Sequence, residues 1–203
     1  KTLKENPKSI QELINKGESG ILEFKSSVWT IMKEGEANFG ERDDCLLDVI
    51  VKEVAGFLNS EGGTILIGVS DDGLPTNGIE KDLGQSTNVN NLDTLMMQIE
   101  KVLERDLYCT SQNMRKCWNI REASLGETTI IRINVKRRAP KPVLAYQKNE
   151  QKKKRQKFEK KNPGSSSQHI KVDEYFKFIR RGRKIEPIIS NESWQAICDG
   201  WDD

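Results

Sequence analysis

The sequence has few of the residues that usually build metal centres, and it has no long hydrophobic run. One histidine and four cysteines occur among its 203 residues, and no two cysteines form a CxxC pair. A zinc site is therefore poorly supported, and reduced thiols in a cytoplasmic protein are expected. No segment has the length and hydrophobicity of a membrane span and no signal peptide is recognisable, so no membrane partner is expected.

An excess of charge of one sign is also nearly absent. The 33 basic and 31 acidic residues leave a formal net charge of only +2. Total charge therefore does not indicate nucleic-acid binding, which would have to come from local basic patches. A share of 35% hydrophobic and 32% charged residues is typical of a polar globular chain that can still bury a core.

The length suits one domain, which we expect to span residues 1–203. The composition changes at about residues 147–170, where the basic run Lys152–Arg155 is followed by proline, glycine and serine. This pattern predicts a flexible basic insertion and not a domain boundary. The chain starts at Lys1 and not at Met, which is compatible with a fragment of a longer protein.

The most informative stretch runs from a helix through a glycine turn into a buried strand. Apolar residues at helical spacing predict a helix from Leu46 to Asn59, which Gly62 and Gly63 end. The apolar run Ile65–Val69 predicts a short strand covered on both faces. Glu61 lies at the joint, where the negative end of the helix dipole disfavours an anion. Its carboxylate is therefore suited to a metal ion, a cation or water.

Strand-like and helix-like periodicities predict the other elements. In Leu22–Lys25, apolar residues alternate with Glu23 and Lys25, as in a strand with one apolar face. The same reasoning gives a short helix before Gly17, a helix from Asn91 to Leu107, paired strands from Trp118 to Ala123 and from Thr128 to Lys136, an edge strand from Pro142 to Tyr146 and a strand from Glu174 to Arg180. Val28–Asp44 is expected to be a loop or a loosely helical insertion, and Asp71–Gly78 a hairpin or a loop. This order predicts an α+β fold, a mixed β-sheet flanked by helices.

Three carboxylates are candidates for chemistry: Glu18 before the first strand, Glu23 within it and Glu61 after the central helix. If the two strands are neighbours, Glu23 and Glu61 can approach each other, and converging carboxylates repel unless a cation joins them. Mg²⁺ or Mn²⁺ takes such oxygen ligands and could supply a water nucleophile at a phosphate. Lys25, on the same strand face as Glu23, could orient a water molecule or hold a phosphate oxygen, and it is therefore a fourth catalytic candidate. The alternative for each carboxylate is a solvated surface position.

A set of basic residues at strand ends and turns could form a phosphate-binding rim, or could equally be solvated. Its members are Arg137, Arg138, Lys141, Arg180, Arg181, Arg183 and Lys184. Lys25 completes the candidates for nucleic-acid binding. Phosphate contacts from lysine and arginine supply much of the affinity of proteins for nucleic acid. This rim is the kind of local patch that the small total charge leaves open.

Several segments together resemble the Schlafen AlbA_2 domain. The chain carries an opening motif, a long central signature and short late landmarks that are similar to those of this family: Glu18-Ser19 with Leu22–Ser27, Ala55–Gly73, and then Gly78–Glu80, Phe178–Gly182 and Pro187. The resemblance covers roughly Gln11 to Ile197, with residues 148–168 as an insertion relative to the usual pattern. The central signature is the most specific part.

The resemblance implies an α+β fold in which helices flank a mixed sheet. In animal Schlafen proteins two such lobes form a U-shaped cradle for tRNA-like RNA, so this single lobe is expected to homodimerise or to pair with another Schlafen-like lobe. Family members with endoribonuclease activity use three acidic residues and a divalent metal, and Glu18, Glu23 and Glu61 fall on those positions. The third position is usually Asp in the animal enzymes, so Glu61 is a departure that bears on metal geometry.

Three interpretations of function follow. The first is a metal-dependent endoribonuclease domain that cleaves structured RNA such as tRNA, with Mn²⁺ or Mg²⁺ on Glu18, Glu23 and Glu61. The second is a non-catalytic nucleic-acid-binding module of a regulator or defence protein, with RNA or DNA as its target. The third is a structural or oligomerisation domain. The three acidic positions favour the first interpretation, whereas the near-neutral charge and the departure at Glu61 favour the second.

Overall fold

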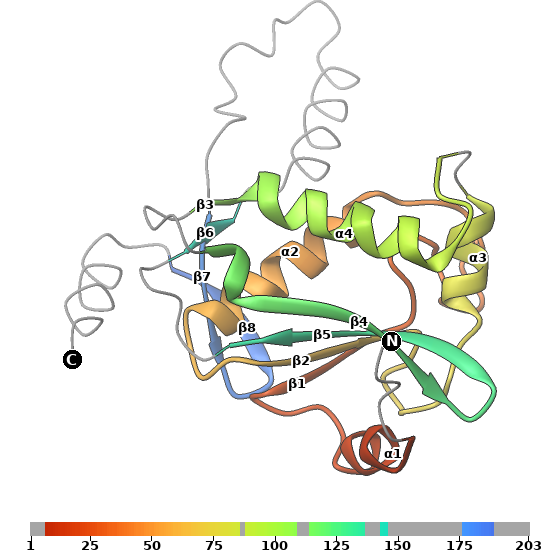
Figure 1. Ribbon diagram of the computed structural model, residues 1–203, viewed down its shortest axis with the longest axis horizontal. Coiled ribbons are helices and arrows are strands. Elements are labelled where there is room, and N and C mark those ends of the chain that lie inside the picture. Colours follow the sequence, from red (N-terminus) through yellow and green to blue (C-terminus); the bar gives the residue numbers. More distant parts are fainter. Residues whose placement is uncertain (1–6, 86–87, 109–113, 137–142, 146–175, 189–203) are drawn as a thin grey trace, which may run out of the picture.

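The fold is built around one mixed sheet with helices on both faces (Figure 1). The computed structural model describes residues 7–85, 88–108, 114–136, 143–145 and 176–188. Along these residues the elements are α1 Pro7–Asn15, β1 Leu22–Lys25, α2 Cys45–Leu58, β2 Gly63–Ile67, α3 Gly78–Gly84, α4 Leu92–Asp106, β3 Leu107–Tyr108, the short 3-10 helix Met114–Lys116, β4 Trp118–Leu125, β5 Thr128–Val135, β6 Leu144–Ala145, β7 Phe176–Arg181 and β8 Lys184–Pro187. The predicted α+β class is confirmed.

The main sheet has the strand order β1-β2-β5-β4. β1 and β2 run parallel, with Glu23 opposite Ile65, and β5 is antiparallel to both β2 and β4. The expectation that the first strand and the strand after the central helix are neighbours is therefore confirmed. The predicted β4–β5 hairpin is also present, and its turn places Gly126 at a φ of 62°, a conformation that favours glycine.

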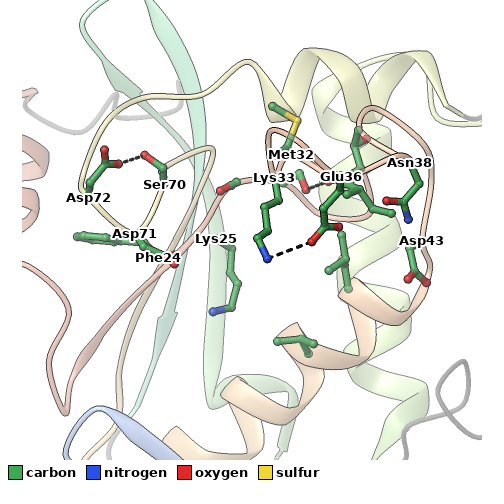
Figure 2. Close-up of a pocket in the computed structure, with 16 residues that line it drawn as sticks. Phe24, Lys25, Met32, Lys33, Glu36, Asn38, Asp43, Ser70, Asp71 and Asp72 are labelled. Atoms are coloured by element: carbon green, nitrogen blue, oxygen red, sulfur yellow. Dashed lines mark hydrogen bonds and ion pairs between the residues drawn. The ribbon is translucent and has the colours of Figure 1, made fainter.

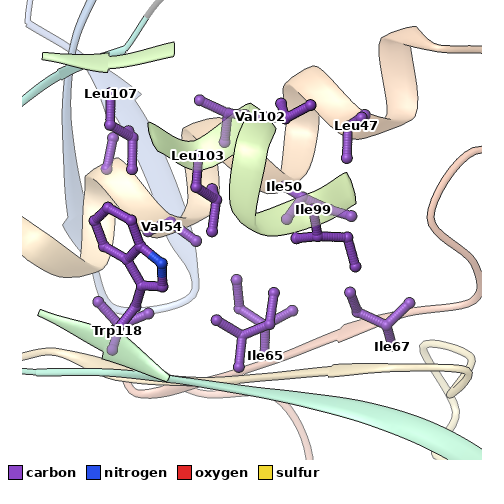
Figure 3. Close-up of a cluster of buried hydrophobic side chains, with 14 of the residues drawn as sticks. Leu47, Ile50, Val54, Ile65, Ile67, Ile99, Val102, Leu103, Leu107 and Trp118 are labelled. Carbon is purple, nitrogen blue, oxygen red and sulfur yellow. The ribbon is translucent and has the colours of Figure 1, made fainter. Parts of the chain in front are cut away.

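Alternation along the strands divides the core into two layers. Ile65 and Ile67 of β2 face α2 and α4, where they pack with Ile50 and Ile99 (Figure 3). Leu66, between them in sequence, faces the smaller layer under α1. Both layers are fully buried at β2, as expected for a strand covered on both faces. α2 and α4 therefore lie on one face of the sheet and α1 on the other (Figure 1).

A second, smaller sheet lies against α2. Its order is β3-β6-β7-β8, and α2 contacts both β7 and β8. Asn59, at the C-terminus of α2, fixes this sheet: its side-chain amide donates to the carbonyls of Val143 and Phe178 and its side-chain oxygen accepts from the Val143 N–H, each at 2.8 Å. These bonds attach the late strands of the chain to the central helix.

A short helix that the sequence did not predict fixes the segment after β1. α3 follows the Asp71–Gly78 turn region, and its Asp82 is completely buried. The Asp82 carboxylate accepts hydrogen bonds from the backbone N–H groups of Val28, Trp29 and Thr30 at 2.6 to 3.2 Å, and from the Thr30 hydroxyl at 2.7 Å. Burial raises the pKa of Asp82, although these hydrogen bonds oppose the rise. The start of the expected loop is therefore anchored in the core.

Some predictions fall outside the described residues. They include the basic insertion at about residues 147–170 and the two ends of the predicted edge strand at Pro142–Tyr146, of which the structure describes Val143 and the short strand β6. β6 pairs with both β3 and β7, so it is not the edge strand that was expected. Among the described residues, none belongs to a helix that is both long and apolar enough to span a membrane.

Candidate functional site

Arg180 joins two buried carboxylates into one ion-pair network. Its Nη2 donates to Glu23 Oε2 and its Nη1 donates to Glu53 Oε2, each at 2.7 Å. Lys25 Nζ donates to Glu23 Oε1 and lies 4.0 Å from Glu53 Oε1. We call these four side chains (Glu23, Lys25, Glu53 and Arg180) the Arg180 network. It joins β1, α2 and β7, and its two positive and two negative charges balance.

Arg180 is itself deeply buried, with 1% of its side chain exposed. Its Nη2 also donates to the Ser19 carbonyl at 2.8 Å, and its guanidinium lies 4.5 Å from the centre of the Phe57 ring. The Arg180 Nε has no hydrogen-bond partner within the described residues. The expectation that Arg180 contacts phosphate does not fit this burial, because an approaching phosphate could not reach the guanidinium. The buried Arg180 side chain instead connects Glu23 and Glu53 within the protein.

Glu53 is an acidic residue that the sequence analysis did not single out. Burial raises the pKa of Glu53 above its usual value and the neighbouring Glu23 carboxylate raises it further, while Lys25 and Arg180 oppose the rise. A signal was present in the sequence, since Glu53 lies in a helix whose residues are apolar on nearly every side. A charge in such a helix requires a buried partner.

Glu18 caps the free edge of β1. Its Oε1 accepts a hydrogen bond from the Phe24 N–H at 3.0 Å, and Ser19 and Leu22 exchange backbone hydrogen bonds. Because β1 is the outer strand of the main sheet, these contacts occupy backbone groups that another strand would otherwise take. Glu18 is thus tied to the strand edge, whereas Glu23 on the same strand faces α2.

Glu61 lies in the turn between α2 and β2 and is exposed. It lines a pocket of about 370 Å³ that also includes Leu13 of α1 and Leu22 of β1, so it borders the face of the sheet that α1 covers. Gly63, two residues after Glu61, is required by packing, since a Cβ there would lie 2.3 Å from Cε1 of Phe57. That glycine makes room for a buried ring of the protein itself.

The three predicted metal ligands do not form one ligand group in this arrangement. No cluster of three or more histidine, cysteine, aspartate or glutamate side chains suited to a metal ion occurs within the described residues. The physical reason is local, because the Glu23 oxygens bind Arg180 and Lys25 and one Glu18 oxygen binds the Phe24 N–H. The described geometry therefore does not fit bound Mg²⁺ or Mn²⁺ without a change at Glu23.

The basic turn between β7 and β8 lies beside the start of β1. Arg181, Arg183 and Lys184 are all exposed, and the turn places Gly182 at a φ of 60°. A Cβ added to Gly20 would lie 3.5 Å from the Gly182 Cα, so the two backbones are in close proximity. The structure therefore brings these three cations to the segment that carries Glu18. The other predicted rim residues, Arg137, Arg138 and Lys141, lie outside the described residues.

A larger pocket, which the sequence analysis did not anticipate, opens at the other end of β1. We call this pocket, of about 760 Å³, the Lys25 pocket. It is lined by the end of β1, the Val28–Asp44 segment, the start of α2 and the turn of Ser70, Asp71 and Asp72. Figure 2 shows Lys25 between the Asp71–Asp72 turn on one side and the Lys33–Glu36 ion pair on the other. The carboxyl ends of parallel strands, where ligands often bind in open sheets, could have indicated this location.

Comparisons with known proteins agree with this architecture. Residues 18–187 match the family described as Schlafen, AlbA_2. The fold is similar to that of a crystal structure, the DIP2311 protein from Corynebacterium diphtheriae, with a TM-score of 0.50 at 12% sequence identity. That similarity covers 95% of this chain but 32% of the other, so this chain spans about a third of that protein. No curated protein sequence matches the chain.

Proposed function

The chain belongs to the Schlafen AlbA_2 family, and on that premise we propose that it is a nucleic-acid-binding domain whose target is RNA. Membership of this family indicates a nucleic-acid-related domain in general. The observation that supports a binding role most directly is the exposed turn of Arg181, Arg183 and Lys184 against Gly20. Three cations on a short hairpin, fixed against the sheet, form a phosphate-binding patch that the small net charge does not reveal.

The basic turn and Lys25 lie at opposite ends of β1, so together they define a line along which a nucleic-acid strand could run. The basic turn lies at the amino end of β1 and Lys25 lies at its carboxyl end, with 22% of the Lys25 side chain exposed. The four residues of β1, Leu22–Lys25, span about 10 Å at the usual strand rise. A short single-stranded RNA segment could therefore contact the turn and Lys25 together. The Arg180 network supports this surface, because Arg180 directly precedes the turn and also binds Glu23 on β1.

Salt dependence tests the binding proposal. The affinity of the protein for tRNA, single-stranded RNA and single-stranded DNA is measured from 50 to 300 mM salt, a range chosen to span about 0.8 log units. If the turn contacts phosphates, R181Q/R183Q/K184Q lowers the slope of log affinity against log salt by about 0.7 for each phosphate of a single strand that the variant no longer neutralises. The matched control K101Q/K116Q/R121Q removes three exposed cations elsewhere and should retain the wild-type slope. An unchanged slope in the turn variant would contradict the proposal, and tighter binding to DNA would contradict the choice of RNA.

A metal-dependent endoribonuclease is the second candidate, and one observation favours it. β1 and β2 are parallel neighbours with Leu22 opposite Thr64, so Glu18 and Glu61 precede the two strands at the same end of the sheet. Glu23 would have to exchange its contacts with Arg180 and Lys25 before it could join them around Mn²⁺ or Mg²⁺. A nuclease would therefore require a rearranged state of this site, and it would act on structured RNA such as tRNA.

A cleavage assay distinguishes the two candidates. The protein is incubated with tRNA, ribosomal RNA or single-stranded DNA, in Mn²⁺, Mg²⁺ or a chelator. The nuclease candidate requires metal-dependent cleavage that E18Q, E23Q and E61Q each abolish. Equal products from wild type and variants would indicate a contaminating nuclease. RNA binding with no cleavage in either metal would leave binding as the function.

The size of the lobe bears on its assembly. We propose that the RNA-binding unit contains two such lobes, either as a homodimer or with another Schlafen-like lobe, because the described part of one lobe presents a single basic turn, that of Arg181, Arg183 and Lys184. Light scattering coupled to size-exclusion chromatography, with and without tRNA, measures the stoichiometry. A complex of one chain with one tRNA at saturating protein would contradict the paired arrangement.

A further inference from the structure

We propose that the Lys25 pocket binds an unpaired RNA base that is rich in hydrogen-bond donors, with guanine as the preferred base. This inference rests on the proposed RNA-binding function and adds to it the kind of nucleotide that is selected. The pocket lies at the carboxyl ends of the parallel strands β1 and β2, between the sheet and the start of α2. Its volume of about 760 Å³ is within the usual range for small-molecule sites.

The pocket combines an apolar interior with acceptors at its rim. Partly buried apolar side chains from two segments line it: Ile31, Met32, Leu46 and Val49. Such a surface suits the flat face of a base, since every base presents a π-face to an apolar wall. Lys33 and Glu36 also line the pocket and form an ion pair, with Lys33 Nζ 3.1 Å from Glu36 Oε1. The apolar part therefore supplies affinity for a planar ring without selecting among the bases.

Selection would come from the turn after β2. Asp71 and Asp72 are both exposed and both line the pocket. The Ser70 hydroxyl donates to Asp72 Oδ1, which lowers the Asp72 pKa, so this carboxylate stays ionised and accepts hydrogen bonds only. Guanine presents adjacent N1–H and N2–H donors, whereas the single N3–H of uracil lies between two carbonyl acceptors that a carboxylate repels. The rim therefore complements guanine and disfavours uracil.

Charge at the pocket explains where the phosphate would go. Four carboxylates line the pocket (those of Glu36, Asp43, Asp71 and Asp72) and two lysines do (Lys25 and Lys33). Lys33 is paired with the exposed Glu36 and Lys25 with the buried Glu23, so a phosphate at Lys25 would share this partly exposed lysine with Glu23. A free anion would be repelled by the acidic rim. A nucleotide would place its base among the carboxylates and its phosphate at Lys25.

The geometry also defines the class of RNA. A base inside a duplex cannot enter a pocket between a sheet and a helix, so the nucleotide must come from a loop, a bulge or a single strand. With phosphates of the same strand at the β7–β8 turn, the pocket would read one base at a fixed distance from the backbone contact. We therefore expect preference for an unpaired guanosine and little preference among duplexes.

Binding of nucleosides to the whole chain tests this inference without RNA. Guanosine, inosine, uridine and guanosine 5′-monophosphate are titrated while amide chemical shifts are recorded. Guanosine should bind about tenfold more tightly than uridine, the discrimination expected of one good bidentate contact, and inosine, which lacks the N2 donor, should lie between them. The shifts should be confined to the lining of the Lys25 pocket.

Variants identify the site. D71N/D72N should reduce the preference for guanosine over uridine to about threefold or less, and N38W, which places a ring at the exposed rim, should abolish nucleoside binding. K25M should remove any advantage of guanosine 5′-monophosphate over guanosine. The control E127Q changes an exposed acid in the β4–β5 turn and should bind as wild type does.

Some results would overturn the inference. Equal affinity for guanosine and uridine, unchanged binding in N38W, or no nucleoside binding at millimolar concentration would each do so. If tRNA binding still depends on the β7–β8 turn in such a case, the proposed function stands and the pocket assignment fails. If the turn variant retains full tRNA affinity but nucleosides bind the pocket, the proposed mode of RNA binding fails and the pocket remains.

Discussion

The buried Asp82 and the buried pair of Glu23 and Glu53 differ in the kind of group that neutralises them. Asp82 accepts hydrogen bonds from three backbone N–H groups and one hydroxyl, all neutral donors in the Val28–Thr30 segment. Glu23 and Glu53 bind the cations of Arg180 and Lys25. Burial raises the pKa of both Asp82 and Glu53. The cost of burying a carboxylate is thus offset by neutral dipoles at Asp82 and by opposite charges at Glu23 and Glu53.

The difference indicates which group could serve a function. The Asp82 donors belong to a fixed backbone, and a ligand could not replace them without unfolding the segment. The Arg180 network is made of side chains, and its partly exposed Lys25 also lines the Lys25 pocket, so an ion or a phosphate could reach the network through Lys25. We therefore assign Asp82 to the fold and the Arg180 network to the candidate site.

The largest effect is expected for R180M, which tests whether the network depends on its central cation. Removal of Arg180 leaves Glu23 and Glu53 buried with Lys25 alone. Breaking a buried ion pair from one side usually destabilises by about 3–5 kcal/mol. Urea unfolding measures the change. R181M, at an exposed neighbouring position, should change the free energy of unfolding by less than about 0.5 kcal/mol. Similar midpoints for R180M and wild type would show that the network adds little.

A somewhat smaller effect is expected for D82A, the corresponding test of the neutral cluster. The variant leaves buried N–H donors at Val28, Trp29 and Thr30 without an acceptor, and one unsatisfied group usually costs about 1–3 kcal/mol. We expect destabilisation by about 3 kcal/mol, because some donors can rearrange. The control is E80Q, an exposed position on the same helix. Unchanged protection of the Val28–Thr30 amides in hydrogen exchange would contradict the anchoring role of Asp82.

K25M sharpens the comparison within the network. Lys25 is partly exposed and bonds to one oxygen of Glu23, while Arg180 remains in place, so the loss should be about 1–2 kcal/mol. The matched variant K33M removes a lysine whose side chain is 79% exposed in its pair with Glu36. That change should be below about 0.5 kcal/mol. Equal effects of the two substitutions would mean that burial does not strengthen the Lys25 pair.

The smallest effect is the pH dependence of the free energy of unfolding, whose sign should differ between the buried Glu53 and the exposed Asp72. Because the pKa of Glu53 is raised on folding, the stability of wild type relative to E53Q is highest below the unfolded pKa of about 4.5 and is lost as pH rises through the folded pKa. Asp72 has a lowered pKa, so wild type relative to D72N should instead lose stability as pH falls below about 4. Unfolding curves between pH 3 and 7 measure both differences. The same sign for both pairs would contradict the contrast.

Local patterns predicted most elements of the fold. The helix expected from Leu46 to Asn59 is observed at Cys45–Leu58, and the helix expected from Asn91 to Leu107 is observed at Leu92–Asp106. Apolar spacing sets such elements, and the central helix is long enough for the pattern to be unambiguous. The α3 helix escaped prediction because it has seven residues and follows a turn rich in glycine, proline and Asx residues.

The candidate site was less accessible to the same reasoning. The sequence placed Glu23 and Lys25 on one strand face, and it indicated a basic turn at Arg181–Lys184, but it could not say what lies opposite them. Long-range contacts decided that: Arg180 is 157 residues from Glu23 and 127 from Glu53. A periodic pattern carries no information about such pairs, because it records only which face of an element is apolar.

The amino-acid sequence by itself determined the α+β class, the strand face shared by Glu23 and Lys25, and the family to which the chain belongs, because each of these depends on local spacing and on contiguous motifs. The tertiary structure alone decided that Arg180 is buried beneath the site, that the basic turn lies beside Gly20, and that a pocket opens beside Lys25. Each of these depends on packing between segments distant in the chain, where burial fixes the partner of a charge and geometry fixes the space left for a ligand.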